Sequence, residues 1–293
     1  MDLSYTILDN LYSNIKEILK MEFHISDRLL RKLKQNSKIF LNNSPVSVNY
    51  NNLHIGDIIS VDLNFDEEYN NIVPTDIPLN ILYEDNYLLV VNKPYHTPVH
   101  PSCNHFADSL SNAVKHYYDI IGLRRKIRIV NRLDKDTSGI VIFAKNEYIQ
   151  ESLIKQMQTH IFKKEYLAIL DGILNSNNGI ISAPIARKEN SIIERCVNFD
   201  TGDIAITHYD LIKTIDESCS LVHFLLETGR THQIRVHSKY IGHPILGDTL
   251  YGQASKLIDR QALHAYKVSF IHPITQEEIQ IEAELPEDMR ILF

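Results

Sequence analysis

The chain has 293 residues, of which 44% are hydrophobic, enough to build the core of one or two domains. No apolar run approaches the roughly 20 residues that span a bilayer, and no signal peptide is apparent, so we expect a cytoplasmic protein with no membrane contact. The net charge of −7 is unfavourable for a protein that holds nucleic acid by general basicity alone. Three scattered cysteines argue against a disulfide framework or a zinc site and predict small buried side chains.

The chain begins with two predicted helices, over residues 14–20 and 26–34. Ser26 or Asp27 is positioned to cap the second helix. Leu29, Leu30 and Leu33 recur on one face of it at helical spacing, which predicts burial. Short strands separated by Asn and Pro turns follow in IFLNNSPVSV and GDIISVDL. The cations that lie off the apolar face are Arg28, Arg31, Lys32 and Lys34.

Residues 66–79 are acidic and asparagine-rich and contain two prolines, which is typical of a linker, so a second domain is predicted over residues 80–293. Its predicted strands lie in ILYE, YLLVVN, IRIV, GIVIFAK, KEYLAIL, AITHYDLI, SLVHFLLE and YKVSF. Lys93–Pro94 is expected to start either a simple turn or a loop that contacts a ligand. Two helices are predicted over residues 108–119 and 147–160, and the second should bury Ile149, Leu153, Ile154 and Met157. Spacing alone therefore indicates an α+β protein.

The segment Ile129–Asn146, IVNRLDKDTSGIVIFAKN, is the most informative part of the chain. It predicts a strand, a tight turn and a second strand, with two acids and two cations in the turn. Charged groups between buried strands are costly to desolvate unless they are paired, so the turn is expected to be a functional site. The charged side chains of this turn are Arg132, Asp134, Lys135 and Asp136.

The same segment resembles the signature HRLDxxTSG of the RluA-type pseudouridine synthases. The resemblance implies that Asp134 is the catalytic residue. Asn131 departs from the pattern, because many family members have His at this place. Both side chains form hydrogen bonds, so the change is expected to leave the chemistry in place.

Four further motifs follow the family order over residues 81–275. KKEYLAILDG resembles the K-x-Y-x-A motif and places the active-site aromatic residue at Tyr166. LETGRTHQIRVHSKYIGHPILGDTLYG resembles the long C-terminal motif and places at Arg235 the arginine that pairs with Asp134. ILYEDNYLLVVNKPYHTPVHPS and LHAYKVSFIHPIT resemble the opening and closing strands. Five motifs in the expected order make the resemblance strong.

The resemblance implies a mixed, mostly antiparallel sheet with a central cleft, preceded by a small S4-like RNA-binding domain over residues 1–70. It implies RNA as the partner and no cofactor or metal, and we expect a monomer. Large-subunit ribosomal RNA is the expected substrate, and transfer RNA or both remain alternatives. Residues expected to contact RNA are Arg132, Arg230, His232, Gln233 and the cations Arg28, Arg31, Lys32 and Lys34 of the basic helix.

The implied reaction converts uridine to pseudouridine in folded RNA. The uridine must leave the base stack, at a cost of a few kcal/mol, before its glycosidic bond can be reached. The C1′–N1 bond then breaks, the uracil turns, and C5 becomes attached to C1′. Asp134 acts either as a nucleophile at C1′ or as a base at C2′, and the sequence does not choose between these roles.

Two other interpretations of the sequence fit some of its residues but leave others unexplained. DKDT after an apolar strand is similar to the D-x-D-x-T start of magnesium-dependent haloacid-dehalogenase-like phosphatases, but no downstream acidic pair completes that site. A binding-only protein would leave the set of Asp134, Tyr166 and Arg235 unexplained. The spacing of His232, His237 and His243 fits no common zinc pattern.

Overall fold

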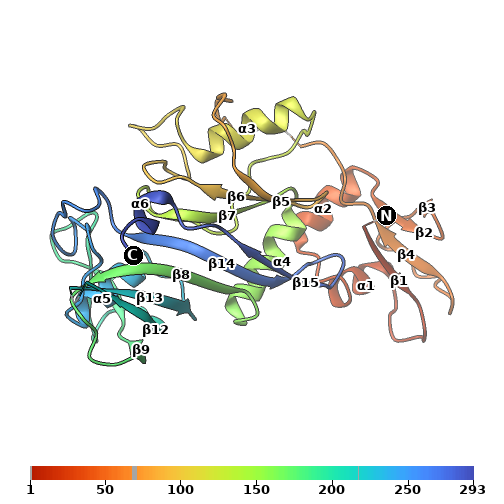
Figure 1. The fold of residues 1–293 in the computed structure, drawn as a ribbon. Helices are drawn as coiled ribbons and strands as arrows, with labels where there is room; N and C mark the ends of the chain where they lie inside the picture. Colours follow the sequence, from red (N-terminus) through yellow and green to blue (C-terminus); the bar gives the residue numbers. More distant parts are fainter. Residues whose placement is uncertain (1, 68–70, 217) are drawn as a thin grey trace.

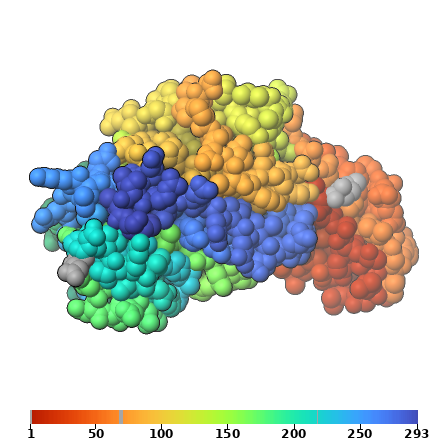
Figure 2. Space-filling view, viewed as in Figure 1, coloured from red at the N-terminus to blue at the C-terminus, as the bar shows by residue number. Residues whose placement is uncertain are grey.

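The computed structural model describes residues 2–67, 71–216 and 218–293. A small N-terminal domain packs against one end of a larger domain built on a long sheet (Figure 1). The space-filling view shows the small domain, coloured red and orange, as a separate lobe at that end (Figure 2). Part of the predicted linker, residues 68–70, lies outside the described residues.

The small domain packs two helices against a four-stranded sheet with the order β1-β4-β2-β3. Ser26 begins the basic helix as predicted, because its side chain accepts the backbone N–H of Leu29. Leu29, Leu30 and Leu33 are buried in the core of this domain, as predicted. The elements are β1 (Leu3–Thr6), α1 (Ile15–Met21), α2 (Asp27–Gln35), β2 (Ile39–Leu41), β3 (Ser44–Pro45) and β4 (Ile58–Val61).

The large domain contains a nine-stranded sheet in which β5-β6-β7-β14-β8-β13-β12-β9 are neighbours and β15 pairs with β14. The described strand pairs of this sheet are antiparallel except for β7 and β14, which run parallel. The fold is therefore mixed and mostly antiparallel, as predicted. Its strands are β5 (Ile81–Glu84), β6 (Leu88–Lys93), β7 (Ser138–Ala144), β8 (Lys163–Asp171), β9 (Asn178–Ser182), β12 (Ile206–Ile215), β13 (Cys219–Leu226), β14 (Leu263–Ile271) and β15 (Glu278–Glu282). A separate pair is formed by β10 (Ile185–Arg187) and β11 (Arg195–Val197).

Helices lie on both faces of this sheet, because alternate residues of a strand point to opposite faces. α3 (Leu110–Ile120) packs on a cluster that includes Leu89 and Val141, whereas α4 (Glu147–Gln158) packs on one that includes Val90 and Ile142. Figure 1 shows the two helices on opposite sides of β6 and β7. The remaining helices are α5 (Gln233–Tyr240) and α6 (Glu287–Arg290).

Several predictions about single elements were wrong. IRIV is not a regular strand, because Ile129 forms only an isolated bridge to Phe143. Ile154 is 39% exposed and is not a core residue, whereas Ile149 and Leu153 are fully buried. Of the cysteines only Cys219 is buried, while Cys103 is exposed and Cys196 is partly exposed.

Ion pairs join the two domains next to the linker. Glu67 accepts two hydrogen bonds of 2.6 Å from the guanidinium of Arg128, and both side chains are 6% exposed. Lys32 of α2 pairs with Glu67 at 3.2 Å and also with Glu147 at the start of α4. Part of the charge of the basic helix is therefore used to hold the domains together.

Candidate active site

The loop between Val130 and β7 is held beside the sheet by the amide of Asn131. This side chain donates to the carbonyl of Ile140 and accepts the N–H of Ile142, both at 2.9 Å. The amide thus replaces the backbone pairing that a regular strand would make. Asn131, at the position where many family members have His, therefore has a structural role, because its amide holds this loop against β7.

The carbonyl groups that follow Asp134 are fixed by two buried cations. Lys93 is fully buried, and its ammonium donates to the carbonyls of Pro94, Thr97 and Lys135 at 2.8–2.9 Å. Burial lowers the pKa of Lys93 to about 7, against the opposing attraction of Asp136. Arg260 donates to the carbonyl of Asp136 at 3.1 Å. Lys93 is thus a support of the loop that carries Asp134.

The turn ends at Gly139, which only glycine can occupy. Its φ of +113° is unfavourable for other residues, and a Cβ atom would lie 2.3 Å from the carbonyl oxygen of Ala265. This close approach allows the parallel pairing of β7 with β14. The loop that carries Asp134 therefore enters the centre of the sheet at a fixed position.

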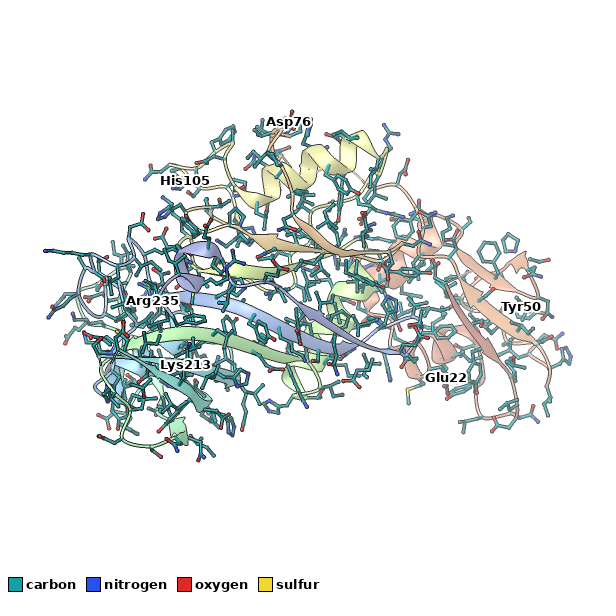
Figure 3. All side chains as sticks on the ribbon, viewed as in Figure 1. Glu22, Tyr50, Asp76, His105, Lys213 and Arg235 are labelled. Carbon is teal, nitrogen blue, oxygen red and sulfur yellow. The ribbon has the colours of Figure 1, made fainter. Side chains whose placement is uncertain are left out.

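Asp134 forms an ion pair with Arg235, as the resemblance implied. The guanidinium donates to Asp134 Oδ2 at 2.9 Å and to both oxygens of the fully buried Asp248 at 2.7 and 2.8 Å. Burial opposes the charge of Arg235, but the hydrogen bonds that it donates to Asp248 and Asp134, and the charges of these carboxylates, outweigh burial and raise the pKa of the guanidinium. Figure 3 shows Arg235 at the end of the sheet distant from the domain that carries Glu22 and Tyr50.

His232 lies beside this ion pair at the N-terminus of α5. Its backbone has a φ of 58°, a left-handed conformation, and its Nε2 atom lies 3.6 Å from Asp134 Oδ2. Its Nδ1 atom forms a 2.8 Å hydrogen bond with the hydroxyl of Tyr251, whose ring also lies 5.0 Å from the guanidinium carbon of Arg235. Burial lowers the pKa of His232, which favours the neutral ring.

Tyr166 of β8 is 8% exposed and faces the same cleft. Burial, and then the charge of Asp134, raise the pKa of its phenol, so the hydroxyl is protonated at neutral pH. Among the described residues this hydroxyl makes no hydrogen bond, whereas the neighbouring Glu165 is paired with His223. The hydroxyl of Tyr166 is therefore available to form a hydrogen bond with a ligand in the cleft.

The two acids of this turn, Asp134 and Asp136, point to different partners. Asp134 faces Arg235, whereas Asp136 accepts a 2.7 Å hydrogen bond from His96. Arg132 is exposed and makes no ion pair with Asp136 in the part of the chain described here. The turn thus does not present the paired carboxylates that the phosphatase interpretation needs. Within the described residues, no three His, Cys, Asp or Glu side chains are arranged to hold a metal ion.

The cleft around Asp134 has a volume of about 500 Å³ and is lined by four cations and one acid. Because Asp134 is paired with Arg235, the cleft is positively charged although the chain is acidic overall. Arg132 and Arg230 lie at its exposed rim, where RNA contact was expected. The four lining cations are Arg132, Lys135, Lys164 and Arg230.

Gln233 has a different task from the predicted RNA contact. Its amide nitrogen donates to Ile206 and Thr207, and its oxygen accepts from Thr228 and the N–H of Arg230. These four bonds use every donor and acceptor position of the amide. Gln233 therefore fixes the start of α5, and the prediction of a direct RNA contact is corrected.

The four cations of the basic helix are divided between two surfaces. Arg28 and Lys32 pair with Glu147 at the domain contact. Arg31 and Lys34 line a groove of about 240 Å³ on the small domain together with Lys16. Only the second pair is free of interdomain ion pairs among the described residues.

Three supporting residues were not predicted to belong to the site: Lys93, Asp248 and Tyr251. The last two lie within the C-terminal motif, in its G-D and YG letters, but no pattern in the sequence showed that they contact Arg235 and His232. The position of Lys93, a cation at the end of the buried strand β6, is the one feature of the sequence that could have indicated its role.

Comparisons with known proteins agree with this site. The family model described as RNA pseudouridylate synthase matches residues 87–240. The RNA pseudouridine synthase YjbO of Bacillus subtilis is 41% identical over 273 residues, which cover 93% of this chain and 95% of that protein. Ribosomal large subunit pseudouridine synthase D of Zymomonas mobilis is 39% identical, with coverage of 81% and 78%.

A solved structure shows the same fold. Human RNA pseudouridylate synthase domain containing 1 has a TM-score of 0.60 and 25% identity, covering 71% of this chain and 83% of that chain. The alternatives of a phosphatase and of a binding-only protein are not favoured by any of these matches. The chain belongs to the RNA pseudouridylate synthase family and is an RNA pseudouridine synthase.

Proposed function

We propose that this enzyme isomerises specific uridines of large-subunit ribosomal RNA, with Asp134 as the catalytic carboxylate. The ion pair of Asp134 with Arg235 at 2.9 Å, inside a positively charged cleft, is the observation that carries the proposal. The printed name of the Zymomonas relative supports the choice of RNA. Transfer RNA, or both RNAs, is the alternative substrate.

The cleft residues act on a uridine that has left the base stack. Tyr166 stacks against the uracil, which contributes about 1–3 kcal/mol to binding. Asp134 acts at C1′ as a nucleophile or at C2′ as a base while the C1′–N1 bond breaks. The uracil turns, C5 bonds to C1′, and the proton of C5 is replaced in the product by one on N1, so the reaction is a balanced isomerisation. Arg132, Arg230 and His232 contact the RNA around this nucleotide.

The small domain is an S4-like RNA-binding module in this proposal. Arg31 and Lys34, which make no interdomain ion pair among the described residues, lie with Lys16 around one groove, where RNA phosphates would be neutralised and their counterions released. No helix among the described residues is long and apolar enough to cross a membrane. We place the enzyme in the cytoplasm, as a monomer that requires neither metal nor cofactor.

Pseudouridine mapping tests the substrate. Ribosomal and transfer RNA from cells with and without the gene would be compared, and both unmodified RNAs would be treated with the purified enzyme. Loss of sites only in large-subunit ribosomal RNA, restored by the enzyme in vitro, is the expected result. Loss of sites only in transfer RNA would overturn the choice of substrate while leaving the activity itself intact.

A further inference from the structure

Lys164 lies in the catalytic cleft, where no role has yet been given to it. It stands on β8 two residues before Tyr166, and alternate residues of a strand share a face. Both side chains line the same cleft. The Cα atoms of Lys164 and Tyr166 are roughly 7 Å apart along the strand. Lys164 is therefore close enough to contact the phosphate next to a base that stacks on Tyr166.

Among the residues that the structure describes, no carboxylate pairs with Lys164. Burial alone lowers the pKa of its ammonium. The nearby acids have other partners, since Glu165 pairs with His223, Glu227 with His208, and Asp134 with Arg235. A half-buried cation without a counter-charge is costly for the free protein, and an anionic ligand would remove that cost.

Gly229 leaves room for this ammonium. A Cβ atom on Gly229 would lie 2.8 Å from Lys164 Nζ, closer than normal contact allows. The φ of Gly229 is outside the left-handed range that favours glycine, so the close approach of the Lys164 ammonium is the local feature that a side chain here would disturb. The loop that carries Arg230 and His232 therefore passes directly against the ammonium and frames it within the cleft.

We propose that Lys164 binds a phosphate group of the RNA next to the flipped uridine and thereby sets how far that nucleotide enters the cleft. The inference rests on the proposed placement of the uracil against Tyr166. Phosphate is the anion that every RNA offers beside each base, and a compact ammonium binds it as a point charge. Lys164 is a positioning residue, because the phosphate that it holds is not a reacting group.

Variants of Lys164 test the phosphate contact. Lys164→Met should weaken binding of a substrate stem-loop about tenfold and reduce the slope of log affinity against log salt by about one. Lys163→Met is the matched control, because Lys163 is exposed and points to the opposite face of β8. Gly229→Ala should produce a smaller loss of the same kind, because the flexible end of Lys164 must move aside.

Stem-loops with one methylphosphonate linkage, which is uncharged, identify the phosphate. A methylphosphonate at one linkage beside the target uridine should lower the affinity of the stem-loop for the wild type. The same linkage should not lower its affinity for Lys164→Met any further. The inference would be overturned if, at every linkage tested, the loss of affinity from the methylphosphonate added to the loss from Lys164→Met. It would also be overturned if the slope of log affinity against log salt were the same for Lys164→Met and Lys163→Met. Reduced turnover with unchanged affinity and slope would also contradict it. An inactive wild type would count against the proposed function instead.

Discussion

Removal of Arg235 should destabilise the protein as well as inactivate it. Arg235→Ala leaves Asp248, which is fully buried, without the guanidinium that donates to both of its oxygens. Breaking a buried ion pair from one side costs about 3–5 kcal/mol. Asp248 keeps two backbone N–H donors, from Leu250 and Tyr251, so we expect the lower end of this range.

The corresponding fall in melting temperature is about 6–12 °C, since a domain of this size loses about 2–4 °C per kcal/mol. Arg230→Ala is the matched control, because Arg230 lies in the same motif but its side chain is 42% exposed, and it should cost less than about 1 kcal/mol. Thermal unfolding of both variants would be followed by circular dichroism. If Arg235→Ala melted within about 2 °C of Arg230→Ala, the argument that Asp248 depends on Arg235 would be refuted.

Three further predictions concern stacking, domain contact and pH. Tyr166→Phe should keep its affinity for a stem-loop, whereas Tyr166→Ala should lose about 1–3 kcal/mol of binding; wild-type affinity in the Ala variant would remove Tyr166 from the pocket. Glu67→Gln should weaken docking of the small domain by about 1.5–3 kcal/mol, because its two bonds to Arg128 lose their charge, and proteolysis near the linker should accelerate; an unchanged cleavage rate would contradict this. Burial lowers the pKa of His264 to about 4, so between pH 6.5 and 4 the unfolded chain binds more protons than the folded protein and acid should remove roughly 3 kcal/mol of stability. His264→Gln should flatten this decline in urea titrations, and an equal slope in the variant would show that another group is responsible.

The sequence predicted the parts of the fold that depend on local patterns. The helices α2, α3 and α4 follow from apolar spacing, and Ser26 marked the start of α2. α5 was not predicted, because it begins at His232 in a left-handed conformation without a side-chain cap. IRIV has strand-like residues and makes two backbone hydrogen bonds to β7, but the next pairing is made by the side chain of Asn131, which no propensity scale describes.

The motifs predicted the main residues of the site, but they did not predict the residues that hold those side chains in place. The pairing of Asp134 with Arg235 was expected, and the structure contains it. The dependence of Arg235 on Asp248 joins residues on a helix and a loop, and only the packed structure reveals it. For the same reason the sequence could not show that Gln233 and Lys32 bond to other residues of the protein. Both are polar residues in segments that were expected to contact RNA.

The most direct test of the central claim is pseudouridine formation by Asp134→Asn. This change keeps the size of the side chain and removes its charge, so the purified variant should fold and bind RNA but form no pseudouridine in a large-subunit ribosomal RNA transcript. The wild type should convert its target uridine fully, with or without EDTA. Substantial pseudouridine formation by Asp134→Asn at a wild-type melting temperature would contradict the assignment of Asp134 as the catalytic carboxylate.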